Sequence, residues 1–233
     1  MSNNIPRFSP LFLILASLFI TLLLISNITA GKLALFFGIT LPAAVLLFPL
    51  TYIFGDVLTE VYGFYRTRLV IWIGLGANLV MVLAFMITLA LPYPDFWNGQ
   101  EAYATVLGLT PRLVGASLAA YLMGEFSNAM VLSRLKIKTE GRRLWMRTIG
   151  STIVGEGIDT VIFISIAFGG SMPWSGLAGM ILAQYLWKVA YEVGVTPLTY
   201  LVVRWVKGRE QIDVYDIDVN YNPFDLRVEN GRI

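Results

Sequence analysis

The chain contains neither cysteine nor histidine in its 233 residues. This excludes disulfide frameworks, zinc sites built on Cys or His, cysteine nucleophiles and Ser-His-Asp triads. Charged residues are also scarce, at 14%, whereas soluble domains carry about 25%. Because 57% of the residues are hydrophobic, the composition predicts an integral membrane protein.

Long apolar runs dominate what is present. A membrane-spanning helix needs roughly 20 mostly apolar residues. Six such windows cover 11–30, 40–62, 68–91, 112–133, 148–170 and 175–203. The sequence therefore predicts an all-α integral membrane protein, with a six-helix transmembrane domain over 1–205 and a polar tail over 206–233. The alternating run IDVYDIDV in that tail fits either a short strand or an extended segment.

Lysine and arginine are unevenly distributed over the loops, and basic loops stay on the cytoplasmic side of a membrane. With the amino terminus inside, Lys32 and Arg112 fall outside and Lys188 lies within the last window. The other 14 of the 17 basic residues fall inside. This pattern predicts a multi-pass protein with both termini cytoplasmic.

The apolar windows contain charged residues, although each charge at mid-bilayer costs at least about 2.5 kcal/mol. Helical spacing arranges them in four stripes, which we expect to face an interior cavity rather than lipid. Up to five of the negative charges then need protons, cations or a ligand rich in hydrogen-bond donors. The charged residues are Asp56, Glu60, Glu125, Glu156, Asp159, Lys188 and Glu192, and nearby polar residues are Asn27, Asn78 and Asn128.

A structural role is an open alternative for two of the stripes. Lys188 and Glu192 are four residues apart and could neutralise each other. Asp56 and Glu60 lie near the cytoplasmic end of their window, within reach of Arg66 and Arg68, and could anchor the loop there. The other three carboxylates lie too far from any loop for this explanation, which favours a functional role.

Three runs of residues together resemble the queuosine precursor transporters, also called the vitamin uptake transporter family. They are FPLTYIFGDVLTEVYG (48–63), RTIGSTIVGEGIDTVIFISIAF (147–168) and the tail motif YNPF (221–224). The resemblance covers nearly the whole chain. It implies the six-helix fold of the vitamin-binding subunits of energy-coupling-factor importers. It also implies uptake of 7-cyano- or 7-aminomethyl-7-deazaguanine across a bacterial inner membrane.

The implied substrate suits the residue types in the stripes. A deazaguanine presents a flat pair of N–H donors that one carboxylate can accept, and its ring can stack on aromatic side chains. The expected contacts are Glu156 and Asp159 with the base, Glu125 and Asn128 opposite them, Asp56 and Glu60 in gating or recognition, and Asn27, Trp187 and Tyr191. We expect no enzyme activity, cofactor, metal or nucleic acid partner, and a homo-oligomer is left open.

A solitary secondary carrier could be driven by protons, because a buried carboxylate can exchange one as the cavity alternates. Glu125 and Glu192 are the candidates, with Lys188 stabilising the charged form of Glu192. One alternative is a substrate-binding subunit that needs a separate ATPase. Another is an intramembrane enzyme, for which Gly55 and Asp56 match only part of a G-x-G-D motif. The excess of buried carboxylates argues against a structural scaffold.

Overall fold

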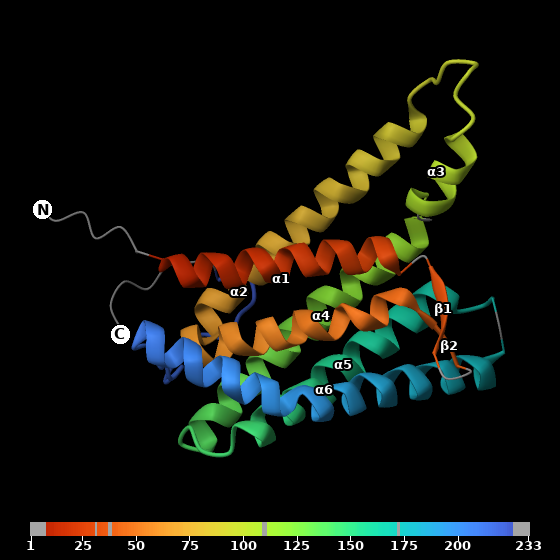
Figure 1. Ribbon diagram of the computed structural model, residues 1–233. Helices are drawn as coiled ribbons and strands as arrows, with labels where there is room; N and C mark the ends of the chain where they lie inside the picture. The colour runs from red at the N-terminus through yellow and green to blue at the C-terminus, as the bar shows by residue number, and fades with distance from the viewer. Residues whose placement is uncertain (1–7, 31, 37–38, 109–110, 172, 226–233) are drawn as a thin grey trace, which may run out of the picture.

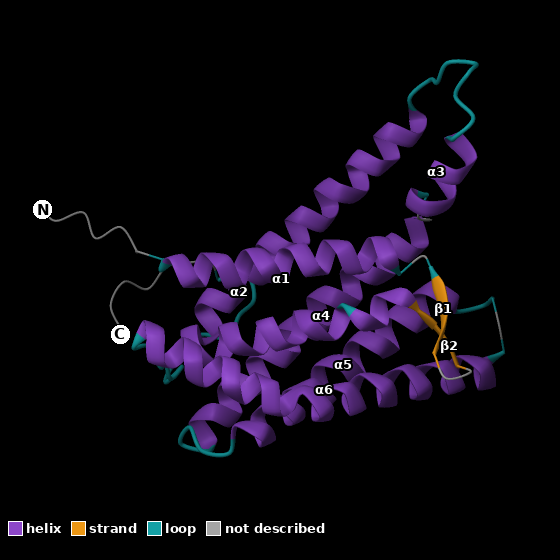
Figure 2. Cartoon of the chain, in the orientation of Figure 1, coloured by secondary structure: helices purple, strands orange, loops and turns teal. Residues whose placement is uncertain are grey.

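The computed structural model describes residues 8–30, 32–36, 39–108, 111–171 and 173–225. In this part of the chain long helices pack side by side, and strand is confined to one short pair (Figure 1, Figure 2). The helices are α1 (Pro10–Thr29), α2 (Phe48–Ala90), α3 (Gln100–Leu107), α4 (Pro111–Lys138), α5 (Leu144–Phe168) and α6 (Trp174–Glu210). Arg7, Arg227 and Arg232, which the charge pattern includes, lie outside the described residues.

Within the described residues, four stretches are long and apolar enough to cross a membrane. They are Pro10–Thr29, Pro49–Ala90, Gln100–Lys138 and Leu144–Phe168. Leucine and isoleucine side chains such as Leu13, Leu83 and Ile87 are exposed on their outer faces, as expected where lipid surrounds the helices. The chain is an all-α membrane protein.

Helix α1 begins at a capped end and packs against α2. The Ser9 hydroxyl accepts a hydrogen bond from the Phe12 amide at 3.1 Å, and Pro10 occupies the first turn, where no amide donor is needed. One face of the helix is buried, with the spacing of an amphipathic helix. Its large apolar side chains are Phe12, Leu15, Phe19 and Leu23.

The chain before α2 is not helical. β1 (Leu33–Phe36) and β2 (Ile39–Pro42) pair antiparallel, and a 3-10 turn over Ala43–Leu46 follows. The second apolar window predicts helix from residue 40, so its first residues are a difference from expectation. Pro42 explains it, because the residue before a proline is driven to extended backbone and the proline itself supplies no amide donor.

Helix α2 consists of two segments joined at Gly63. This residue has a φ of +83°, which is not helical and which glycine adopts without a steric penalty. Figure 1 shows the chain running along the first segment and returning in another direction along the second. The second and third apolar windows therefore correspond to the two segments of α2.

α3 lies in the connection 92–111, where no helix was expected, and none of its side chains is buried. α6 continues past the predicted domain boundary at 205 and ends at Glu210. No strand forms in the described part of the tail, where IDVYDIDV has no regular secondary structure and turns at Ile217 and Asp218.

The tail folds back over the turn at Gly63. Asp216 accepts hydrogen bonds from the Phe64 amide at 2.9 Å and from the Ser133 hydroxyl at 2.5 Å. A Cβ on Gly63 would lie 2.7 Å from Asp216 Oδ1, so the tail fits only against a glycine. Asp216 therefore satisfies the first free amide of the second segment of α2, as an N-cap residue does.

The YNPF motif continues this contact. Trp72 Nε1 donates to the Pro223 carbonyl at 2.8 Å, and Arg68 Nη1 donates to the Asn222 carbonyl at 2.7 Å. The Phe224 ring packs on Trp72 with the ring centroids 5.6 Å apart. The motif thus fixes the tail to the second segment of α2.

Candidate functional site

A network of charged side chains surrounds Glu60, at the end of the molecule where the tail folds back. Arg147 binds the two carboxylate oxygens of Glu60 at 2.8 and 3.1 Å, and Lys207 Nζ lies 2.7 Å from Oε1. Lys136 Nζ lies 3.9 Å from Oε1 and 2.5 Å from Asp213 Oδ1. We call Glu60, Lys136, Arg147, Lys207 and Asp213 the end network.

Every charged side chain of the end network has an oppositely charged partner, and we call such a network closed. Glu60 is fully buried and Arg147 is 1% exposed, and a bidentate pair of this kind is among the strongest that side chains form. Burial raises the pKa of Asp213, but the hydrogen bonds from Lys136 and Lys207 outweigh burial and bring that pKa below its usual value. Glu60 is therefore held by structural partners.

The partners of Glu60 differ from those that the sequence indicates. Arg66 lies over the Tyr62 ring, at 5.9 Å from its centroid, and Arg68 binds the tail carbonyls. The cations that neutralise Glu60 come from α4, α5 and α6 instead. The estimate of five uncompensated carboxylates is wrong on this point, because lysine and arginine stems reach inward from helix ends.

Deeper in the helices, Lys188 of α6 bridges two carboxylates of α5. Its Nζ lies 2.6 Å from Glu156 Oε2 and 2.6 Å from Asp159 Oδ2. The three side chains are at most 10% exposed. We call them the Lys188 triad. The intrahelical pair with Glu192, which the spacing permits, is not among the ion pairs of the described residues.

A second deep group has hydrogen-bonding atoms without a partner in the described part of the chain. Asn128 Nδ2 donates to Asp56 Oδ1 at 2.8 Å, which leaves Asp56 Oδ2 and Asn128 Oδ1 open. Glu192 Oε1 and Trp187 Nε1 are also buried and open. Asp56, Asn128 and Glu192 are at most 2% exposed. We call Asp56, Asn128 and Glu192 the open set.

Buried polar atoms are almost always paired, because an unpaired one costs about 1–3 kcal/mol. Glu192 is close enough to Asp56 for the two carboxylates to interact electrostatically. The open set thus joins α2, α4 and α6 around a group of atoms that can bind a polar ligand.

Two glycines allow α4 and α5 to approach closely beside these groups. A Cβ on Gly155 would lie 2.7 Å from Asn128 Cβ, and a Cβ on Gly124 would lie 2.8 Å from Asp159 Cβ. Contacts this short do not occur in packed proteins. The two glycines therefore determine how closely α4 and α5 pack at Asn128 and Asp159.

Other predicted residues lie near the deep groups or apart from them. Glu125 is 3% exposed and its Oε2 would lie 3.4 Å from a Cβ on Gly55. Tyr191 is half-buried on α6. Asn27 does not join the deep carboxylates, because its Nδ2 donates to Asn78 Oδ1 at 2.6 Å and links α1 to the second segment of α2.

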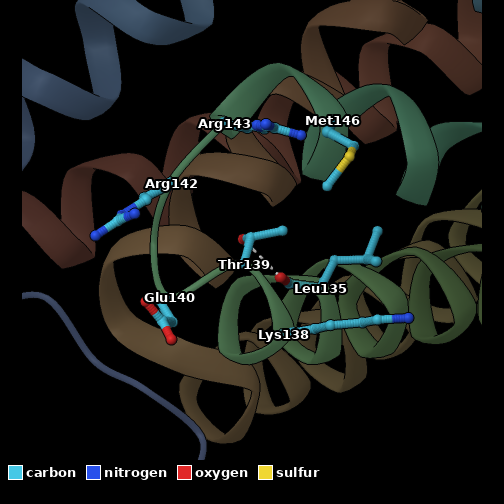
Figure 3. Close-up of a pocket in the computed structure, with 7 residues that line it drawn as sticks. All are labelled: Leu135, Lys138, Thr139, Glu140, Arg142, Arg143 and Met146. Carbon is cyan, nitrogen blue, oxygen red and sulfur yellow. Dashed lines mark hydrogen bonds between the residues drawn. The ribbon is translucent and has the colours of Figure 1, made fainter.

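A pocket lies elsewhere, at the turn between α4 and α5. It has a volume of about 500 Å³, and its lining is Leu135, Lys138, Thr139, Glu140, Arg142, Arg143 and Met146. Figure 3 shows Lys138, Glu140 and Arg142 pointing in different directions rather than toward one point.

Among the residues that the structure describes, no three acidic side chains are arranged to hold a metal ion. Sequence reasoning found the acids but not their partners. The basic pattern places Arg147, Lys136 and Lys207 on the cytoplasmic side, and each lies within the first or last turn of its helix, from where a long side chain can reach inward.

Residues 42–202 match the family model described as "Putative vitamin uptake transporter". The chain belongs to this family. The matched range includes all six acidic candidates and Lys188. The chain is 27% identical to the "Probable queuosine precursor transporter" of Bacillus subtilis (strain 168) over 187 residues. These residues cover 80% of this chain and 82% of that protein.

A second relative is the "Queuosine precursor transporter" of Escherichia coli (strain K12). It is 28% identical over 155 residues, which cover 63% of this chain and 65% of that protein. No solved structure gives a significant match. The relatives are named as transporters, and the apolar helices agree with a multi-pass membrane protein.

Proposed function

We propose that this protein imports a queuosine precursor of the 7-deazaguanine type across a bacterial inner membrane, as a solitary secondary carrier without enzyme activity. The observation that carries the proposal is the open set, because it offers buried hydrogen-bonding atoms to a flat polar ligand. Family membership and the names of the relatives supply the substrate class.

The topology that fits this function has six crossings and both termini in the cytoplasm. The start of α1, the connection between α4 and α5, and the end of α6 lie at one end of the molecule (Figure 1). The end network and the basic connection 139–143 belong to that same end, which basic residues assign to the cytoplasm. The polar tail from 206 is cytoplasmic in this topology.

Cysteine labelling tests the topology cleanly, because the chain has no cysteine of its own. A Gly99→Cys variant should react with an impermeant thiol reagent in intact cells, whereas Glu140→Cys should react only after the cells are opened. Labelling of Glu140→Cys in intact cells would contradict the proposed orientation.

Recognition of the base is assigned to the open set rather than first to Glu156 and Asp159. Both of those carboxylates are engaged by Lys188, so a ligand would have to displace a buried cation to use them. Asp56 and Asn128 have an open acceptor each. The Lys188 triad holds α5 against α6 beside the ligand.

Proton exchange at Glu125 or Glu192 drives the uptake in this proposal. Neither carboxylate has an ion pair with a lysine or arginine in the described part of the chain, so each must be neutralised by a proton or a ligand. Lys188 is already shared between two other acids and does not serve Glu192 as its main partner.

Purified protein in liposomes tests the function. Labelled 7-deazaguanine precursors should accumulate without an ATPase, and faster when an inward proton gradient is imposed. The gradient effect should weaken in Glu192→Gln and persist in Glu101→Gln, a change at an exposed position of α3. Uptake that requires an added ATPase complex would identify an importer subunit instead.

A further inference from the structure

Within the proposed function, on which this inference rests, we infer that the deep site selects a precursor bearing a positive charge, such as a primary ammonium group beside the base. The open set contains more acceptors than donors, and the charges around it are mainly negative. Both properties favour a cationic ligand over a neutral one of the same shape.

The acceptors can be counted atom by atom. Asp56 Oδ2, Asn128 Oδ1 and Glu192 Oε1 are open acceptors. The edge of a deazaguanine supplies an N1–H and an exocyclic amine to acceptors. Two acceptors are then used, and a third remains for another donor on the ligand.

The charges point the same way. The Lys188 triad has two carboxylates and one ammonium, so it retains one negative charge when both acids are ionised. Asp56 and Glu192 add carboxylates that have no cationic partner among the described residues. A ligand ammonium would supply the missing cation, as lysine does for Glu156 and Asp159.

Two known forms of the precursor differ in the required property. The aminomethyl group is a primary amine and is protonated at neutral pH, as a lysine side chain is. The cyano group has no hydrogen to donate and presents an acceptor to a site of acceptors. A site built to bind a donor rejects an analogue that lacks it, because its own polar atoms stay unpaired.

Competition for uptake tests the inference in the intact carrier. Liposomes containing the parent protein are given labelled 7-aminomethyl-7-deazaguanine and increasing amounts of unlabelled 7-aminomethyl or 7-cyano compound. The aminomethyl compound should compete at a concentration about tenfold or more below that of the cyano compound. In Glu192→Gln this ratio should fall toward one, because a neutral amide has lost the charge that the ammonium requires.

Two controls separate selectivity from folding. Glu101→Gln should keep the parent ratio, and thermal melting should show that Glu192→Gln is folded. Asp56→Asn provides a second variant, in which both compounds should compete less well and the ratio should also fall.

The outcomes distinguish the inference from the function. Equal competition by the two compounds in the parent, or an unchanged ratio in both folded variants, overturns the charge selectivity and leaves the transport function standing. A cyano compound that competes better shows that the carboxylates bind as protonated donors, which also overturns the inference. Failure of both compounds to enter or compete refutes the proposed function itself.

Discussion

Asp56 and Glu60 stand one turn apart on the same helix, and both are fully buried, yet their surroundings are opposite. Three cations surround Glu60, whereas Asp56 receives one amide donor and keeps one oxygen open. Burial of a carboxylate therefore does not by itself indicate a binding site. The completeness of its partners separates a structural acid from one that can receive a ligand.

This difference also predicts what is lost when a residue of each group is replaced. A closed network is destabilised when one partner is removed, because the remaining charge stays buried without compensation. An open group already lacks a partner in the described residues, so its removal should change binding more than folding. The predictions below separate these two outcomes.

The largest effect is expected at the end network. Glu60→Gln leaves the buried Arg147 without its anionic partner, which should cost about 3–5 kcal/mol of stability. Thermal melting of the detergent-purified protein measures this loss. Exposed Glu101→Gln is the matched control and should melt with the parent to within about 0.5 kcal/mol. A Glu60→Gln protein as stable as the parent would show that the network is not structural.

An intermediate effect is expected where α4 and α5 approach beside the open set. Gly155→Ala places a Cβ against Asn128 and should cost about 1–3 kcal/mol through overpacking. Gly157→Ala is the control on the same helix, since its Cβ would meet Tyr185 at an ordinary 3.6 Å. Melting and uptake should both fall in Gly155→Ala. Equal behaviour of the two variants would contradict the close approach.

The smallest effect concerns the tail and its pH dependence. Burial raises the pKa of Asp216 above its usual value, although Ser133, the Phe64 amide and Lys136 act against burial. The folded state therefore holds the Asp216 proton more tightly than the unfolded state, and this contribution is lost as pH rises through the raised pKa. Between pH 3.8 and that pKa, the tail should dock more firmly as pH falls.

Hydrogen exchange of residues 211–225 measures this docking. Protection should increase modestly on lowering the pH through that window in the parent protein, and Asp216→Asn should remove the dependence on pH. Protection that decreases with falling pH in the parent, over the same window, would reverse the assigned sign.

Much of the fold could be predicted because bilayer length and helical spacing leave few choices. The apolar windows locate α1, α4, α5 and α6 to within several residues, and the two segments of α2 follow the second and third windows. The strand pair before α2 and the helix α3 were missed. The strand pair includes Pro42, which disfavours helix at the residue before it, and α3 has only eight residues with no buried face to produce an apolar pattern.

The residues of the deep site could be predicted by type, because charges in a membrane are costly and stand out. Their partners could not be predicted. Lys188 pairs across to α5 instead of along its own helix, and the direction of a long side chain depends on which helices are neighbours. The base contact first expected at Glu156 and Asp159 stays a prediction, and the open atoms of Asp56 and Glu192 favour another arrangement.

The contrast between Asp56 and Glu60 is tested most directly by measuring stability and ligand binding in the same two variants. Asp56→Asn should melt close to the parent and bind the labelled precursor about 30-fold or more weakly, which corresponds to about 2 kcal/mol. Glu60→Gln should melt well below the parent, while the fraction that stays folded binds with the parent affinity. Parent-like binding by Asp56→Asn, or loss of binding by folded Glu60→Gln, would contradict the account.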